Sequence, residues 1–257
     1  MILNLNQLNV LNPKLSIIIC TLNSEKYLTQ CLESIISQSF KDYEIIVVDG
    51  GSIDKTLSIV NCFNISKVFT DVKGGVSCAM NFGITKAIGD IIAILHSDDY
   101  YYSNATLQKV IDCFDEKKCN WLYGNIVYLK ENEEFTFNVN ANYSQDYFSH
   151  TFNIPHPAVF IKKLVYDEIG LFSTQYKYAM DYDLLLRVAN KYTPEQLDDN
   201  LTVFRQHKES LSTSNWSSAQ VESLIIQQKH AKNIFIKLKG IFRFMKSRLA
   251  RIKNDLL

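Results

Sequence analysis

Two adjacent carboxylates, Asp98 and Asp99, follow directly after an apolar run that ends at Leu95. Because neighbouring like charges repel, such a pair at the end of an expected strand suggests that the carboxylates hold a positive group. Mg²⁺ and Mn²⁺ prefer oxygen ligands and bind through one or two carboxylates together with substrate phosphates. The stretch Ser97-Asp98-Asp99 therefore predicts a divalent-cation site, although two solvated aspartates at the start of a loop remain the simpler alternative.

Polar residues also follow three other apolar runs, as expected for a ligand site on an open α/β sheet. In such sheets, ligands bind beyond the carboxyl ends of the strands, so these residues should meet at one rim. They are Thr21 and Asn23, then Asp49 to Ser52, then Asp71, Lys73 and Gly74. The sequence contains neither GxGxxG nor GxxxxGK[ST], which argues against dinucleotide oxidoreduction and P-loop chemistry.

The elements that must position these residues alternate between strand and helix in the first hundred residues. Short β-branched runs predict buried strands over 15–20, 44–49, 67–70 and 90–95, and apolar spacing predicts helices over 24–38, 54–63 and 76–87. Repeated βα units imply a parallel, doubly wound sheet. The later chain predicts strands over 121–130, 134–139 and 200–205, an irregular stretch over 140–158, and helices over 162–170, 181–192 and from about residue 217.

Length and composition indicate an ordinary globular protein. The 257 residues suffice for one large domain with an appendage, and we expect a domain over 14–215 followed by a helical extension over 216–257. Six scattered cysteines include no CxxC pair, which favours buried reduced thiols over a zinc site. The N-terminus lacks the basic and small-residue features of a signal peptide, and no window of 18 apolar residues predicts a membrane span.

Charge is unevenly distributed along a chain whose formal net charge is zero. From Lys229 onward there are nine Lys or Arg residues and one acidic residue, Asp255. Apolar residues recur there at three- and four-residue steps: Ile234, Phe235, Leu238, Ile241, Phe242, Met245, Leu249, Ile252 and Leu256. This pattern favours a helix lying on an anionic membrane surface; the alternative is a terminal helix packed on the core. Nucleic acid is a poorer fit, because the positive charge is confined to one helix.

Two long stretches resemble family 2 glycosyltransferases with a GT-A fold. They are SIIICTLNSEKYLTQCLESIISQSFKDYEIIVVDGGSIDKT and GGVSCAMNFGITKAIGDIIAILHSDD, and HPAVFIKKLVYDEIGLF and YAMDYDLLLRV extend the resemblance to about residues 14–210. The DGGS stretch is similar to the bacterial cell-surface polysaccharide branch. His96, Met180 and Val72 depart from the acidic or amide residues usual in the family, which puts the finer donor contacts in question.

The resemblance implies a Rossmann-like, mostly parallel central sheet flanked by helices, and a role for each matching residue. Thr21, Asn23 and Glu25 would border the base and ribose, and Asp49 would contact the base. Lys73, Asn81 and Ser97 would lie near the donor, Asp98 at the ribose or sugar, and Asp99 at the metal and diphosphate. Asp181 would be the catalytic base, with Asp183 as its competitor. His156 and His207 are further possible site residues; His96 we expect to pack.

These roles together imply an inverting, Mg²⁺- or Mn²⁺-dependent transfer of a sugar from a nucleoside diphosphate, UDP- or dTDP-linked, to a hydroxyl of a growing surface glycan. A lipid-linked acceptor would place the protein at the cytoplasmic face of a bacterial membrane. A sugar nucleotidyltransferase is a weaker alternative, because CTLNSEKY lacks its Gly-rich basic loop. A non-catalytic carbohydrate- or nucleotide-binding relative is the other alternative; loss of Asp99 or Asp181 would have favoured it, and both are present.

Overall fold

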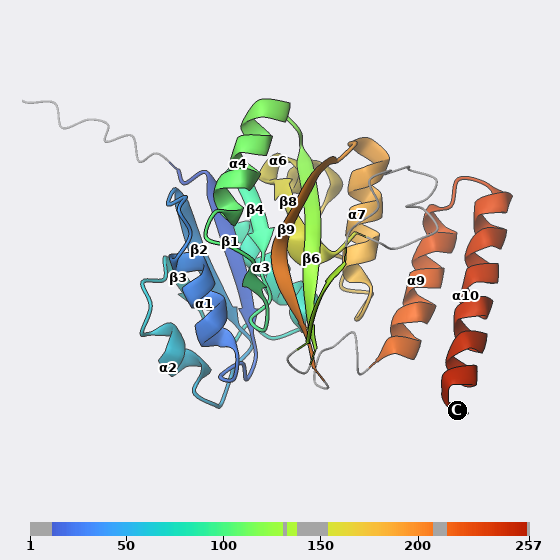
Figure 1. The fold of residues 1–257 in the computed structure, drawn as a ribbon, viewed down its shortest axis with the longest axis horizontal. Helices are drawn as coiled ribbons and strands as arrows, with labels where there is room; N and C mark the ends of the chain where they lie inside the picture. The colour runs from blue at the N-terminus through green and yellow to red at the C-terminus, as the bar shows by residue number, and fades with distance from the viewer. Residues whose placement is uncertain (1–11, 131–132, 138–153, 208–214, 256–257) are drawn as a thin grey trace, which may run out of the picture.

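The computed structural model describes residues 12–130, 133–137, 154–207 and 215–255. A central sheet of nine described strands has the order β3-β2-β1-β4-β8-β6-β9-β5, with β7 paired to β6 (Figure 1). The strands are β1 (Leu15–Thr21), β2 (Tyr43–Asp49), β3 (Lys67–Phe69), β4 (Ile91–Ile94), β5 (Tyr100–Tyr101), β6 (Trp121–Lys130), β7 (Glu133–Phe137), β8 (Val159–Lys162) and β9 (Glu195–Gln206).

Most of these strands run in one direction. The pairs β1–β2, β2–β3 and β1–β4 are parallel, as the βα repeats predict. β8 is antiparallel to both β4 and β6, so β6 runs with β1, and β9 is parallel to β6. The carboxyl ends of β1, β2, β4 and β9 therefore face the same rim of the sheet, where the polar residues were expected to gather.

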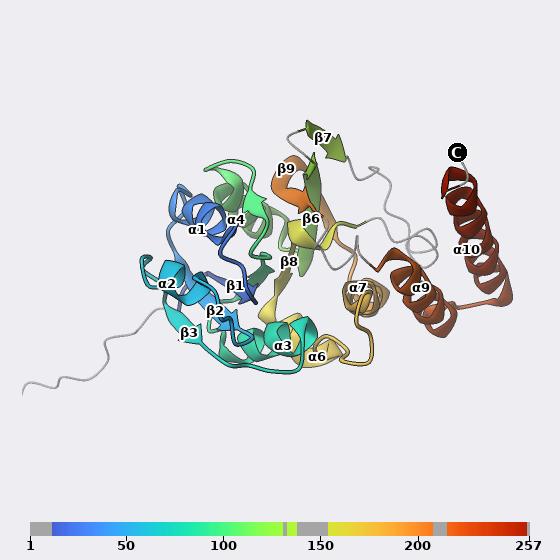
Figure 2. The ribbon, with the colours of Figure 1, turned by 90° about the horizontal axis from the view of Figure 1, so that it is seen from below.

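Helices cover both faces of the sheet and enclose two apolar cores. The helices are α1 (Leu28–Ile36), α2 (Thr56–Val60), α3 (Val76–Lys86), α4 (Thr106–Lys117), α6 (Lys163–Ile169), α7 (Met180–Lys191), α9 (Trp216–His230) and α10 (Ile234–Asp255), with a 3₁₀ turn η1 (His156–Ala158). One core joins α1 and α4 to the sheet, and the other joins α3, α6 and α7 to its opposite face (Figure 2). Consecutive residues of β1, such as Ile17 and Ile18, belong to opposite cores, as expected for a strand that is buried on both faces.

The two C-terminal helices extend one end of the molecule, with α9 on α7 and α10 outside α9 (Figures 1 and 2). Gln227 of α9 donates to the backbone oxygen of Ile236 at 2.8 Å. A Cβ at Gly240 would lie 2.0 Å from the Gln227 side-chain oxygen, so this glycine permits the close approach of the two helices. The domain division at residue 215 stays a prediction, although α9 contacts α7 directly.

The expected elements are present, with shifted bounds and some additions. The helical region from residue 217 is two helices, and the last strand, β9, begins at Glu195 rather than residue 200. Three elements, β5, α4 and β8, were not predicted. Most of the irregular stretch expected over 140–158 lies outside the described residues. Within the described part of the chain, no helix has the length and apolar character needed to cross a bilayer.

Candidate active site

The loop after β2 is organised by the buried carboxylate of Asp49. One oxygen accepts from the Thr21 and Ser52 hydroxyls, and the other accepts from the backbone N–H groups of Gly51 and Ser52, both at 2.8 Å. Burial raises the pKa of Asp49, but these four hydrogen bonds outweigh it and the net pKa is lowered. The carboxylate therefore stays charged and fixes the DGGS loop against the end of β1. Its predicted contact with a base stays a prediction.

Hydrogen bonds of Asn23 and Glu25, two residues expected to border the base and ribose, join the loops after β1 and β2. Asn23, at a positive φ of 51°, accepts from the Ile53 N–H at 3.0 Å, and its own N–H donates to Ser52. Glu25 accepts from the Lys55 N–H at 2.9 Å. Asn23 and Glu25 are both exposed, so they rim the site while fixing its loops.

Lys73 reaches back over the glycine loop. Its ammonium group pairs with Asp71 at 2.6 Å and donates to the backbone oxygen of Gly50 at 3.0 Å. Gly51 has a φ of 95°, and a Cβ there would lie 2.2 Å from the Lys73 nitrogen. The positive φ of Gly51 is the conformation that favours glycine as the second glycine of DGGS, and a side chain there would also displace the Lys73 ammonium group.

After β4, the chain brings Ser97 and Asp98 to the rim. Ser97 shares a hydrogen bond of 2.8 Å with the hydroxyl of Ser24 in the loop after β1. Asp98 lies 2.9 Å from the imidazole Nε2 of His207, which follows β9. Both partners are partly exposed, with 29% of the Asp98 side chain and 19% of the His207 side chain accessible. The sequence-predicted His207 is therefore at the site.

Asp99 lies beneath this rim rather than on it. It is 1% exposed, and one oxygen accepts from the Arg205 N–H at 3.0 Å. The other oxygen, Oδ2, is buried and has no hydrogen-bond partner among the described residues. Burial, followed by the neighbouring Asp98 charge, raises the pKa of Asp99 well above its usual range. The geometry thus separates the two aspartates, which the sequence alone could not do.

Two histidines, His96 and His156, line the same cavity as Asp98 and the predicted base, Asp181. The His96 and His156 rings have centroids 6.0 Å apart, and His156 meets Phe172 edge-on. Burial lowers the pKa of His96, and burial together with His96 lowers that of His156 to about 3. Both rings are therefore neutral near pH 7 and can only exchange hydrogen bonds there.

Asp181 occupies the first turn of α7 and lines this cavity. Burial, with a contribution from Glu222, raises its pKa to about 6, although the Tyr182 N–H donates to it at 2.8 Å. A carboxylate with that pKa is ionised at pH 7 yet basic enough to accept a proton.

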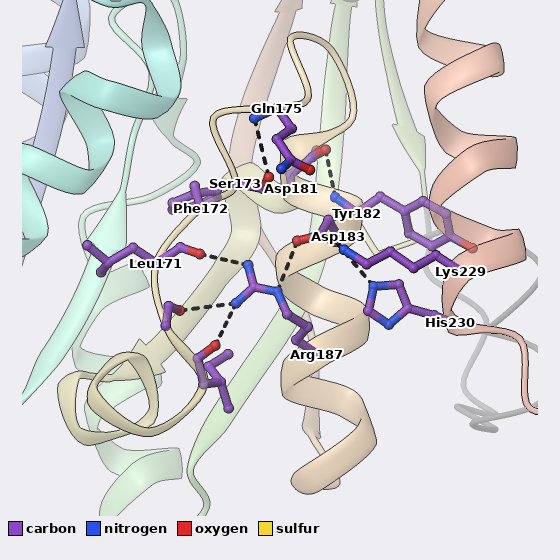
Figure 3. A network of polar contacts seen from close by, with 12 residues as sticks. Leu171, Phe172, Ser173, Gln175, Asp181, Tyr182, Asp183, Arg187, Lys229 and His230 are labelled. Atoms are coloured by element: carbon purple, nitrogen blue, oxygen red, sulfur yellow. Dashed lines mark hydrogen bonds and ion pairs between the residues drawn. The ribbon is translucent and has the colours of Figure 1, made fainter.

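Asp183, two residues on, points away and is committed to structure. Its oxygens accept from Arg187 Nε at 2.9 Å and contact His230 Nε2 at 3.1 Å (Figure 3). The Arg187 guanidinium also donates to the backbone oxygens of Ile169 and Leu171, so this cluster joins α6, α7 and α9. Asp183 is 2% exposed and is unsuited to contact a substrate.

Asn81, which was expected near the donor, is hydrogen-bonded within the fold. Its amide nitrogen donates to the backbone oxygen of Phe172, and its amide oxygen accepts from the Phe172 N–H, both at 2.9 Å. The side chain therefore holds the loop before α7 against α3. Its predicted place near the donor stays a prediction.

Two adjoining cavities collect the exposed members of the site. The larger, of about 420 Å³, is lined by His96, Ser97, Asp98, His156 and Asp181 together with apolar groups that include Met80 and Met180. The smaller, of about 210 Å³, shares Ser97 and Asp98 and adds Asn23, Tyr27 and His207. Six predicted residues thus line these two cavities: Asn23, Ser97, Asp98, His156, Asp181 and His207. The other six line neither: Thr21, Glu25, Asp49, Lys73, Asn81 and Asp99.

Sequence reasoning missed Arg205 and Glu222. Arg205 lies over the Tyr27 ring with its guanidinium carbon 4.3 Å from the ring centroid, and it also donates to the backbone oxygen of Asp98. Glu222 accepts three backbone N–H bonds next to Asp181. The position of Arg205, at the end of a predicted strand two residues before His207, was a usable signal; nothing in the sequence distinguishes Glu222.

This polar rim and its two cavities lie beyond the carboxyl ends of the strands, where ligands bind in open α/β sheets. The family model for Glycosyl transferase family 2 matches residues 16–170, and the chain belongs to this family. It is 34% identical over 181 residues to a PGL/p-HBAD biosynthesis glycosyltransferase of Mycobacterium tuberculosis, covering 68% of this chain and 69% of that protein. The resemblance noted in the sequence is confirmed, and the protein is a glycosyltransferase.

Solved structures agree on the GT-A fold. Residues 1–349 of S. aureus TarS in complex with UDP-GlcNAc superpose with a TM-score of 0.68 at 20% identity, covering 89% of this chain and 71% of that one. A Pyrobaculum calidifontis mannosyltransferase in complex with GDP-Man and Mn²⁺ gives 0.67 at 17% identity, covering 94% and 76%. The chain spans 43% of a longer TarS chain. The predicted fold class is confirmed.

Proposed function

We propose that this glycosyltransferase moves a sugar from a nucleoside diphosphate to an acceptor hydroxyl with inversion, using a divalent cation. The observation that carries the proposal is that Asp98 and Asp181 line the same cavity. A cation site next to the departing diphosphate and a base next to the incoming hydroxyl are the two groups that direct displacement needs. UDP- or dTDP-sugars are the proposed donors.

The rim residues fit Mg²⁺ or Mn²⁺. The described residues contain no group of three or more His, Cys, Asp or Glu side chains arranged for a metal. Such cations commonly use one or two protein ligands and complete their shell with water and phosphates, so two suffice. We assign Asp98 and His207 as those ligands, because they are 2.9 Å apart and accessible. The unpartnered Asp99 oxygen beneath them keeps the earlier assignment of Asp99 open to test.

When bound, the cation would stabilise the negative charge that develops on the departing diphosphate. The residues of the chain supply the rest. Asp181 accepts the proton of the acceptor hydroxyl as that oxygen attacks the anomeric carbon. Neutral His96 and His156 hold the sugar side of the cavity without adding charge. Thr21, Asn23, Glu25 and Asp49 organise the loops proposed to hold the base and ribose, and Lys73 lies at their edge.

The acceptor is proposed to be a growing surface glycan, such as O-antigen, capsule or exopolysaccharide, on a lipid carrier. The mycobacterial relative is, by its printed name, a glycosyltransferase of PGL/p-HBAD biosynthesis, which supports a role in a biosynthetic pathway. A non-catalytic relative is disfavoured, because the pKa of Asp181 is raised to about 6 inside the cavity, as suits a proton acceptor.

Nucleotide binding tests the proposal directly. Melting temperatures would be measured with UDP, dTDP, GDP, ADP and CMP, with and without Mn²⁺. A ligand at about 100 times its Kd adds about 2.7 kcal/mol, which raises the Tm by about 5–10 °C for a chain of this size. We expect a Mn²⁺-dependent shift with one diphosphate and a smaller shift with its monophosphate, the matched control. Equal shifts in EDTA would contradict metal dependence, and no shift with any of the nucleotides would contradict donor binding at this site.

We also propose that α10 docks the protein on the anionic inner face of the cell membrane. Seven large apolar side chains of α10 are exposed although the helix packs on α9: Ile234, Phe235, Leu238, Ile241, Phe242, Met245 and Leu249. Phe235 and Phe242 are 73% and 68% exposed. The excess of Lys and Arg from residue 229 onward complements anionic headgroups. Apolar and basic groups on one helix favour an interfacial position over a solvated end.

Vesicle binding checks this second proposal. The full chain should sediment with phosphatidylglycerol vesicles and much less with phosphatidylcholine vesicles. Phe242→Ser should weaken the binding at least about tenfold, because a buried Phe contributes about 2 kcal/mol. Leu164→Ser, at an exposed leucine of α6, is the matched control and should bind as the unmodified chain does. Binding that ignores headgroup charge, or concentration-dependent dimers in place of binding, would contradict membrane docking.

A further inference from the structure

Glu222, a half-buried residue of α9, holds the backbone segment that leads into α7. One carboxylate oxygen accepts from the Lys177 N–H at 3.0 Å, and the other accepts from the Tyr178 and Ala179 N–H groups at 2.7 and 2.9 Å. These three residues immediately precede Met180 and Asp181. Hydrogen bonds to a charged acceptor are roughly twice as strong as neutral ones, so a single side chain fixes three consecutive peptides.

A second contact from α9 holds the other side of Asp181. His230 meets the Asp183 carboxylate at 3.1 Å, and Arg187 meets the same carboxylate from within α7 (Figure 3). The backbone is therefore anchored directly before and directly after Asp181. Both anchors come from the C-terminal helix α9, which contributes no residue to the lining of the larger cavity.

We propose that Glu222 is a positioning residue for Asp181, fixing the first turn of α7 and placing a negative charge behind the base. The proposal rests on the function proposed above, because it takes Asp181 to be the base. It assigns α9 a part in catalysis: the helix sets where the base stands and how readily it accepts a proton. A shift of about 1 Å at a reacting group can cost about 100-fold in rate, so backbone anchors of this kind matter.

The charge of Glu222 acts on Asp181 together with its other neighbours. Burial raises the pKa of Asp181 first, and Glu222 raises it further, whereas the Tyr182 N–H lowers it. Asp98, His96, His156 and Tyr178 share the cavity with Asp181. Removing the Glu222 charge should therefore lower the pKa of Asp181 and move the acid limb of any base-dependent rate to lower pH.

Titration of the Asp181 carboxyl carbon by ¹³C NMR tests this without any substrate. The signal is assigned by its loss in Asp181→Asn, and amide exchange at 178 and 179 is followed in the same full-length samples. Glu222→Gln removes the charge and keeps part of the hydrogen bonding, so the pKa of Asp181 should fall while amide exchange rises modestly. Glu222→Ala should do both and speed exchange at 178 and 179 at least about tenfold. Glu116→Gln, at an exposed glutamate of α4, is the control.

The rate of UDP release from UDP-GlcNAc measures the effect of the Glu222 substitutions on catalysis. Glu222→Ala should slow release by about 10- to 100-fold with little change in UDP binding, and Glu222→Gln should move the acid limb downward. An unchanged Asp181 pKa and unchanged exchange in both variants would overturn the proposal. Asp181→Asn with full turnover would instead overturn the base assignment, while the NMR titration would still report whether Glu222 and Asp181 are coupled.

Discussion

Asp181→Asn should reduce sugar transfer by about 10²–10⁴-fold and leave Mn²⁺-dependent nucleotide binding unchanged. General-base catalysis contributes about this much, and an amide cannot accept the proton of the acceptor hydroxyl. Asn keeps the size of the side chain and can still accept from the Tyr182 N–H, so the fold of the first turn is retained. Donor turnover and nucleotide-induced Tm shifts, measured on the same preparations, separate the two effects.

The pH dependence of sugar transfer supplies an independent test of Asp181 as the base. Because the pKa of Asp181 is raised to about 6, the base is protonated below that pH, and transfer should fall as pH drops through about 6. A carboxyl with a raised folded-state pKa favours the fold at low pH, and that contribution is lost as pH rises through about 6. Asp181→Asn removes this loss and should raise the Tm at pH 7.5, although it removes activity.

Asp183→Asn is the matched control for stability, because Asp183 lies two residues after Asp181 in the same helix, α7. Burial raises the pKa of Asp183, but His230 and Arg187 outweigh this and lower it. Its charge therefore stabilises the fold above its unfolded pKa. Asp183→Asn should therefore lower the Tm at pH 7.5, the opposite of Asp181→Asn. If Asp181→Asn kept most of its turnover, the base would have to be another group in the cavity.

The first half of the fold could be predicted because its elements are local and repetitive. Each buried strand is a short β-branched run, and each polar loop follows a strand end, so parallel topology brings Asp49 and Asp98 to one rim. The four predicted strands pair in the structure as βα units require. β8 and β5, of four and two residues, were not predicted, and neither was α4, although its twelve residues include apolar groups at helical spacing.

The assignments within the site depended on contacts between distant parts of the chain. His207 reaches Asp98 because β9 pairs with β5, which follows Asp98 directly, and no local pattern encodes that pairing. Asn81 matches a family motif, yet its amide is engaged with the backbone of Phe172, 91 residues away. Glu222 lies on a helix whose sequence indicates only a surface element. Spacing places residues on a rim, and only packing decides which of their atoms face the ligand.

The choice between Asp98 and Asp99 as the cation ligand yields the second large effect. Asp98→Asn should abolish the Mn²⁺-dependent part of nucleotide binding, a greater loss than the roughly 10–100-fold typical of residues outside the ligand set. Asp98 is accessible and lies beside His207. Loss of its charge leaves the His207 imidazole as the other assigned ligand, too little for a hard cation that prefers oxygen.

Asp99→Asn is the discriminating partner because it should have the smaller effect. Burial raises the pKa of Asp99, which disfavours its charged form, and Asn can still accept from the Arg205 N–H. Mn²⁺ titrations followed by electron paramagnetic resonance, with the diphosphate that shifts the Tm, would compare both variants. If Asp99→Asn abolished binding and Asp98→Asn did not, the ion would sit deeper, with the orphan Asp99 oxygen as its ligand. Asp98 and His207 would then be a hydrogen-bonded pair at the rim and not cation ligands, because the replacement of a true ligand should release the cation.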